Sequence, residues 1–157
     1  MNEAIQTLVK KVQQTGGEKP KPASAEDLKR AEEAGFPSEL IEFYRECEPA
    51  DCIEIKQRIW SIDNALVENR DAVPGCALFP HGFIVFASNM CGDSYCIDTN
   101  VTTPEGHHPV VLFSHEMIEE DTPLSRMQFL RLEVAKSLED FLVKFTSEAL
   151  INEPLYG

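Results

Sequence analysis

Two short apolar runs separated by a polar loop constrain the fold of this chain more than any other feature. Residues 83–87 read FIVFA and residues 95–97 read YCI, and both runs are rich in residues that favour β-strands. The loop between them ends in Gly92-Asp93, where Gly permits a positive φ and Asp accepts hydrogen bonds from the amides of a turn. This spacing predicts two adjacent antiparallel strands joined by residues 88–93, with Gly92 at positive φ.

The first of these runs lies within a long stretch that carries no charge. Residues 72–92 contain no side chain that is charged at neutral pH, which on hydropathy alone resembles a membrane span. Pro, Gly, Ser and Asn residues interrupt the stretch repeatedly, so it is too broken to cross a bilayer. We therefore expect a buried sheet with turns in this region, and no membrane partner.

Helical patterns flank this central region on both sides. Apolar residues recur at helical spacing in residues 3–13, and the Gly- and Pro-rich residues 15–22 that follow predict an exposed linker. Ser24 and Asp27 form a capping box that begins a second helix, and Gly35 is placed to end it. The other expected elements are a helix after Phe36-Pro37, strands near 52–55, 59–60 and 110–113, a short helix at 62–67 and a closing helix after Ser137.

Helices at both ends of a central run of short strands predict an α+β fold. The gaps between the central strands have hairpin length, which favours a mixed or antiparallel sheet packed by helices from the N-terminal and C-terminal segments. A chain of 157 residues fits one ordinary domain. We expect residues 1–22 to form an N-terminal helix and linker, and residues 23–157 to form a single domain.

The charge balance bears on the class of partner. Lys and Arg total 14 against 27 Asp and Glu, which gives a formal net charge of −13. Such a surface repels the phosphate backbone of nucleic acids and attracts basic proteins. The same charge can also serve solubility alone. The composition therefore predicts no nucleic-acid partner, and it leaves open a basic protein partner or a surface that only keeps the protein in solution.

The acidic residues are concentrated in the middle of the chain. Between Arg70 and Arg126 there are eight Asp and Glu residues and no Lys or Arg. If these acids lie on loops around one sheet they form a continuous acidic face, whereas the alternative is that they are scattered. Half of them fall within six residues and are the candidate partner-binding residues: Glu116, Glu119, Glu120 and Asp121. The alternative for this segment is a solvated loop that serves only solubility.

The five cysteines predict neither a disulfide framework nor a metal site. Their number is odd, and the first residues carry two lysines where the apolar core of a signal peptide would lie. We therefore expect a cytoplasmic protein with reduced thiols. Cys47 and Cys52 are five residues apart, as are Cys91 and Cys96, whereas zinc sites prefer tighter pairs. No metal and no cofactor are expected.

Motifs of catalysis are missing from the sequence. It contains no Gly-rich phosphate loop, no H-E-x-x-H, no G-x-S-x-G and no dinucleotide fingerprint. Cys91 or Cys96 could pair with a His as an activated nucleophile, but many chains of this length offer such combinations by chance. No catalytic residue is predicted, and a thiol- or metal-dependent enzyme is kept only as a further alternative.

Four segments, taken in order, carry a resemblance to a known family. They are residues 36–44, 84–98, 109–116 and 137–142. In the second segment an apolar strand runs into a Gly-Asp turn and then into a strand with an aromatic residue and a terminal Asp. The motif residues are Pro37, Tyr44, Gly92, Asp93, Tyr95 and Asp98. This order of motifs resembles the SUKH superfamily, the Smi/Knr-like immunity and cell-wall-assembly regulator family, over roughly residues 24–146.

The resemblance implies an α+β domain that acts by binding and has no catalytic residues. It also implies a role as a bacterial immunity protein that neutralises a cognate toxin, or as a regulatory scaffold. Nuclease toxins are often basic because they bind nucleic acid, so the acidity of this chain suits such a target. We therefore expect a non-enzymatic protein-binding module with a toxin as its partner, and a regulatory scaffold as the alternative.

Overall fold

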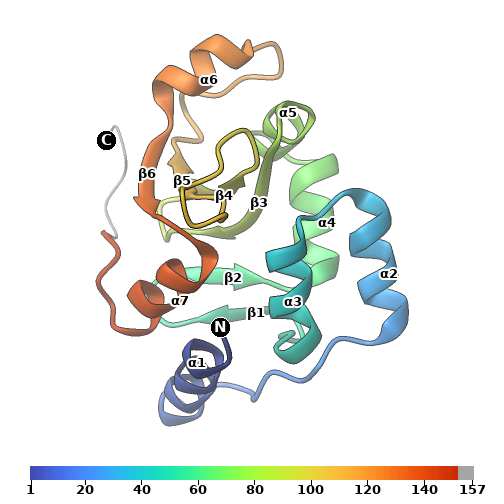
Figure 1. Cartoon of the computed structure of the whole chain (residues 1–157), viewed down its shortest axis with the longest axis vertical. Helices are drawn as coiled ribbons and strands as arrows, with labels where there is room; N and C mark the ends of the chain where they lie inside the picture. The colour runs from blue at the N-terminus through green and yellow to red at the C-terminus, as the bar shows by residue number, and fades with distance from the viewer. Residues whose placement is uncertain (152–157) are drawn as a thin grey trace.

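An antiparallel sheet forms the centre of the molecule in the computed structural model, which describes residues 1–151 (Figure 1). The strands follow one another across the sheet in sequence order, so each pairs with its neighbours in the chain. They are β1 (Cys52–Glu54), β2 (Arg58–Trp60), β3 (Phe83–Ser88), β4 (Ser94–Asp98), β5 (Val110–Phe113) and β6 (Leu132–Ala135). The predicted α+β class is confirmed, and the sheet is the antiparallel one of the two types expected.

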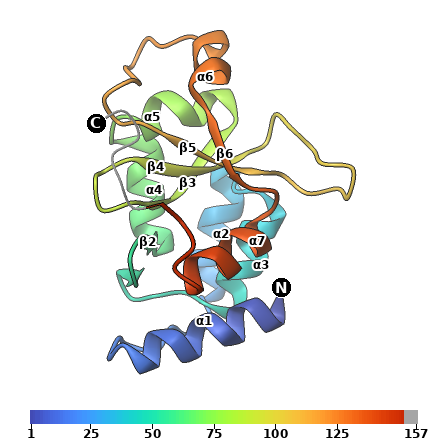
Figure 2. The same ribbon diagram turned by 90° about the vertical axis from the view of Figure 1, so that its left-hand side faces the viewer.

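Helices from both ends of the chain pack beside this sheet. They are α1 (Asn2–Gln14), α2 (Ala25–Ala34), α3 (Ser38–Glu46), α4 (Ile62–Arg70), α5 (Gly75–Leu78), α6 (Leu124–Leu130) and α7 (Leu138–Thr146), with a 3-10 helix at Phe79–His81. The first and the last of them, α1 and α7, lie against each other although they are far apart in the sequence (Figures 1 and 2). This arrangement confirms the expected packing by N-terminal and C-terminal helices.

Apolar clusters cover both faces of the sheet. One cluster joins Ile84 and Tyr95 to residues of α1, α3 and α7, and the other joins Val85 and Cys96 to residues of α5 and α6. Figure 2 shows α5 and α6 on one side of the sheet and α1, α3 and α7 on the other. Because successive side chains of a strand point to opposite faces, strands covered on both faces are apolar throughout. This double cover explains why the apolar runs of the central strands are continuous.

The predicted hairpin of β3 and β4 is confirmed. Val85 pairs with Cys96 and Ser88 with Ser94 in antiparallel register, with an irregularity between Val85 and Ala87. Gly92 has a φ of 88°, in the left-handed region that favours glycine. The expected helix caps are also present. The Ser24 hydroxyl accepts a hydrogen bond from the amide of Asp27, and Gly35 ends α2 with a φ of 96°.

Residues 72–82 differ from the expectation of sheet and turns, because residues 75–81 form α5 and the 3-10 helix. These short helices lack charged residues because they are buried, as the strands are: Ala77 and Leu78 belong to the apolar cluster on the α5–α6 side of the sheet. The sequence patterns also do not predict α6 or β6, whose burial is confined to a few positions. Within residues 1–151, no helix has the length and apolar character needed to cross a membrane.

The segment between α1 and α2 is attached to the body at one point. Most of residues 15–22 are exposed as expected, but Pro20 is buried. Lys21 and Glu48 exchange backbone hydrogen bonds with N···O distances of 3.0 and 2.6 Å. Leu8 of α1 is fully buried and belongs to the larger of the two apolar clusters. The N-terminal helix therefore shares its apolar core with the strands and with α7.

Replacing Gly92 with Val is expected to lower the free energy of unfolding by about 1–3 kcal/mol, because a β-branched residue is strained at this positive φ. A Cβ at this position would lie 3.6 Å from the His115 ring, an ordinary contact, so the Cβ itself adds no clash to the conformational cost. Denaturant unfolding of both proteins measures the difference. Gly92→Asn is the matched control, since Asn tolerates the left-handed region, and an equal loss in both variants would contradict this reasoning.

Candidate functional site

The segment between β5 and α6, residues 114–123, carries the four candidate acidic residues and is called the acidic loop. The side chains of Glu116, Glu119, Glu120 and Asp121 are all exposed. Local hydrogen bonds shape the loop. The amide of Glu119 donates to the hydroxyl of Thr122 at 2.8 Å, and the amide of Thr122 donates to the carbonyl of Glu119 at 3.1 Å. The loop is therefore a structured turn that keeps its carboxylates in solvent.

The acidic loop lies against α6. Ile118 is 2% exposed and belongs to the same apolar cluster as Met127 and Leu130 of that helix. This buried side chain sits between the acidic residues in the sequence, so it fixes the loop on the helix while its neighbours point outward. Figure 2 shows the loop and α6 together at one end of the molecule. The four carboxylates therefore border α6.

Large apolar side chains are exposed in the same part of the molecule. Phe129 of α6 is 76% exposed, and Leu132 at the start of β6 is 44% exposed. The guanidinium of Arg126 lies over the Phe129 ring, 5.2 Å from its centroid. Exposed aromatic residues beside polar groups are typical of interaction surfaces. We call Phe129 and Leu132 the apolar pair; together with the acidic loop they form the candidate surface.

The sequence contains a helical signal for α6. Leu124, Met127 and Leu130 recur every third residue after Pro123, which is a short helix with one buried side. Met127 and Leu130 are buried and Leu124 packs against the same cluster. Phe129 falls outside this spacing, so the pattern itself places an aromatic side chain on the solvent side of the helix.

A buried carboxylate holds the base of the acidic loop. The side chain of Asp93, 2% exposed, accepts hydrogen bonds from the His115 amide at 3.1 Å and from His115 Nδ1 at 2.8 Å, both through Oδ1. Its Oδ2 atom accepts from Asn89 Nδ2 at 3.1 Å. These contacts join the β3–β4 turn to the chain that leaves β5. Asp93 is therefore a structural residue that positions the start of the acidic loop.

The central acids do not form one continuous face, which is the second of the two arrangements that the sequence left open. Asp98 is buried, as Asp93 is, and its Oδ2 atom lies 2.9 Å from Arg131 Nε in an ion pair. Glu105 is exposed but belongs to the β4–β5 loop, which projects away from the acidic loop in Figure 2. Asp71 is exposed at the C-cap of α4, so the acidic loop is the one segment that holds several of the eight central acids in exposed positions.

The remaining motif residues serve the fold. Pro37 is the N-cap of α3. Tyr44 is fully buried and its hydroxyl donates to the carbonyl of Trp60 at 2.7 Å, while burial raises its pKa. Tyr95 packs on Phe141 with ring centroids 5.1 Å apart, and burial raises its pKa as well. The two tyrosine side chains are buried and do not reach the surface, whereas Pro37 is half-buried.

Of the two candidate nucleophiles in the sequence, Cys96 is buried and Cys91 is half-buried. In residues 1–151, no group of three or more His, Cys, Asp and Glu side chains is placed to hold a metal ion. Burial raises the pKa of the Cys47 thiol to about 12 and that of Cys96 well above its ordinary value. A raised pKa opposes formation of the nucleophilic thiolate. These two cysteines are small buried apolar residues.

All five cysteines are expected to titrate as free thiols in the unfolded protein without reductant. The reason is that none of them is in a disulfide in this structure and that their spacing does not fit zinc. Thiol titration should find five groups per chain, and metal analysis should find no stoichiometric zinc. A count of three or one, or one equivalent of zinc, would show that this expectation is wrong.

Comparison with protein families gives a match that agrees with the order of motifs in the sequence. The comparison with curated proteins found no match. Residues 22–144 match the profile of the SMI1 / KNR4 family (SUKH-1), so the match extends from the segment before α2 into α7 and includes the whole sheet. Because the matched region is well over half of the chain, this protein belongs to the SMI1 / KNR4 family (SUKH-1).

Proposed function

We propose that this protein is a non-catalytic binding module, an immunity protein of the bacterial cytoplasm, that neutralises a basic toxin through the acidic loop and the apolar pair. SUKH domains are protein-interaction modules, which supports a protein as the partner. The observation that carries the proposal is the position of four exposed carboxylates beside an exposed Phe129 on the same helix-loop unit. A basic protein with an apolar contact surface is the complementary partner.

The two parts of the surface have different physical roles. The carboxylates act at a distance, since a negative field raises the rate at which a cationic protein meets this surface. The apolar pair acts on contact, because removing Phe129 and Leu132 from water slows dissociation. A toxin that binds nucleic acid has a cationic surface, so occupying that surface would block its substrate.

The regulatory scaffold is the second candidate function, and it is favoured by the same family membership. A scaffold would bind several partners and would not need to block an active site. The proposed immunity protein instead needs one partner bound in a fixed stoichiometry. The two functions therefore differ in the effect of the partner when it is expressed alone: a toxin should arrest growth, whereas the partner of a scaffold should not.

Co-expression with the product of a neighbouring gene tests the proposed function. If that product is a basic toxin, it should arrest growth when expressed alone, and this chain should relieve the arrest and form a stable one-to-one complex. Catalytically inactive toxin should bind equally well, because only the surface is recognised. A neighbouring product that is harmless, or an arrest that this chain does not relieve, would favour the scaffold function instead.

A further inference from the structure

A pocket between α2 and α4 lies outside the candidate surface. Its volume is about 340 Å³, which is enough for a few side chains or a small molecule. Phe36, Leu66 and Phe79 form its apolar wall, and Phe36 and Leu66 are 6% and 2% exposed. Such a wall removes apolar surface of an occupant from water.

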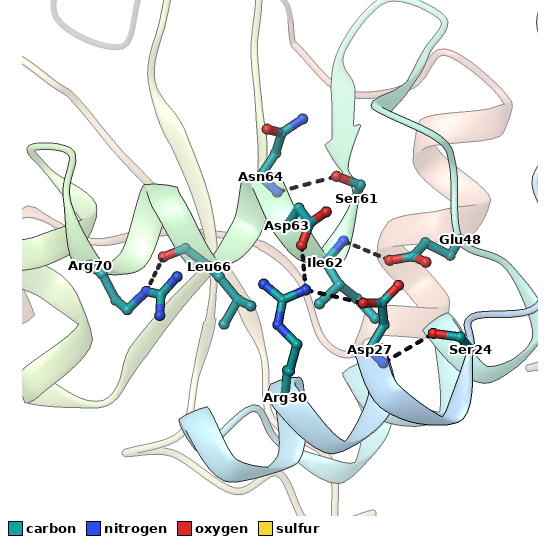
Figure 3. A network of polar contacts seen from close by, with 10 residues as sticks. All are labelled: Ser24, Asp27, Arg30, Glu48, Ser61, Ile62, Asp63, Asn64, Leu66 and Arg70. Carbon is teal, nitrogen blue, oxygen red and sulfur yellow. Dashed lines mark hydrogen bonds and ion pairs between the residues drawn. The ribbon is translucent and has the colours of Figure 1, made fainter.

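Two guanidinium groups line the same pocket. Arg30 comes from α2, and its Nη1 atom lies 2.6 Å from Asp63 Oδ1 and 3.1 Å from Asp27 Oδ1 (Figure 3). Arg70 comes from the last turn of α4, and its Nε atom donates to the carbonyl of Leu66 at 3.2 Å. Figure 3 shows Leu66 between the two arginines. One guanidinium is therefore held by two carboxylates and the other by a backbone carbonyl.

Donor groups of both arginines remain available to an occupant. Within the described part of the chain, Arg30 uses only Nη1 in hydrogen bonds and Arg70 uses only Nε. The charge of Arg30 is offset by its two carboxylates, whereas Arg70 has no ion-pair partner among residues 1–151. Glu33 also lines the pocket, and its Oε1 atom lies 3.8 Å from Lys29 Nζ in an ion pair. Arg30, Arg70, Asp27 and Asp63 together carry no net charge, so the pocket offers the unpaired guanidinium of Arg70 and the free donors of Arg30 beside an apolar wall.

The base of the pocket is rigid. Asn69 is 3% exposed, and its amide group donates to the carbonyls of Ala65 and Val85 at 2.8 Å each. Its side-chain oxygen accepts from the Val85 amide at 2.9 Å. Asn69 therefore has no free polar group for an occupant, and it fixes α4 to β3. Specific recognition of an occupant is left to the two arginines.

We propose that this pocket binds a carboxylate side chain of a partner protein, with the neighbouring apolar side chain of that partner against Phe36, Leu66 and Phe79. Guanidinium groups match a carboxylate in charge and in planar geometry. The unpaired Arg70 guanidinium is opposite in sign to the net charge of −13 of the whole chain, so this site selects a different kind of group from the acidic loop. A partner residue of this kind would fix the orientation of the complex rather than speed the encounter.

Nuclear magnetic resonance with blocked dipeptides tests the proposal on the full chain. The probe is N-acetyl-Phe-Glu-amide, and N-acetyl-Phe-Gln-amide and inorganic phosphate are the comparison ligands. The acidic dipeptide should shift the resonances of Arg70 Nε–H and of Leu66. These shifts should saturate with a dissociation constant below about 20 mM, which is in the range expected for so small a ligand. The Gln dipeptide, which lacks the charge, should bind at least about fivefold more weakly.

Two single variants compare the loss of an arginine in the pocket with the loss of an arginine outside it. Arg70→Gln removes the guanidinium that has no ion-pair partner and should weaken binding of the acidic dipeptide at least about fivefold. Arg45→Gln is the matched control, because Arg45 is exposed on α3 and does not line the pocket. Equal binding of both dipeptides, no saturable shift, or the same loss in both variants would overturn the proposal. Shifts with phosphate but not with the dipeptide would also overturn it, and would assign the pocket to a free oxyanion.

Discussion

Replacing Glu116, Glu119 and Glu120 with Gln and Asp121 with Asn is expected to slow association with a basic partner by about tenfold or more at low salt. The four carboxylates are exposed and have no Lys or Arg within the loop to offset them. Their field is screened over about 8–10 Å at physiological ionic strength, so the difference from the parent protein should shrink as salt rises. Stopped-flow association rates over a salt series measure both effects, and dissociation should be nearly unchanged.

The matched control neutralises four exposed acids on other elements: Glu18, Glu26, Glu32 and Glu42. It changes the net charge by the same amount, so it separates the position of the charge from its total. If both quadruple variants slow association by the same factor, the charge of the whole chain steers the partner and the acidic loop has no special role. If the loop variant keeps the association rate and salt dependence of the parent, the loop serves solubility and the interface lies elsewhere.

Most of the fold is predictable from local sequence signals. The β3–β4 hairpin follows from two apolar runs and a Gly-Asp turn, and Gly92 adopts the positive φ that this pattern requires. The caps at Ser24 and Ser137 follow from short-range hydrogen bonds that need no tertiary partner. These features are local, so a pattern over a few residues is enough to identify them.

The features that were not predicted depend on contacts between distant segments. Residues 75–81 form short helices because the second apolar cluster covers the sheet there, and a charge-free sequence fits both a helix and a strand in such a place. Asp93 and Asp98 count as surface acids in the sequence, but His115 and Arg131 come from later segments and allow their burial. The composition of the acidic loop was visible in the sequence, whereas the neighbouring Phe129 required the position of α6.

Phe129→Ala is expected to speed dissociation of the same complex by about 30-fold, because an aromatic side chain at the centre of an interface is often worth about 2 kcal/mol or more. Phe129 is 76% exposed in the free protein, so its loss should change the free energy of unfolding by less than about 0.5 kcal/mol. The association rate should stay within about twofold, since no charge changes. Dissociation rates, association rates and denaturant unfolding of the variant check these three expectations separately.

Val67→Ala is the control, because Val67 is an apolar residue of α4 that is 45% exposed and belongs to neither the acidic loop nor α6. It should leave both rates unchanged. A variant that combines Phe129→Ala with the four loop substitutions should show the slow association of one and the fast dissociation of the other, since steering acts before contact and burial acts after it. If Phe129→Ala leaves dissociation unchanged while the loop variant still slows association, the carboxylates steer the partner to an apolar contact elsewhere, and α6 borders the interface without forming its centre.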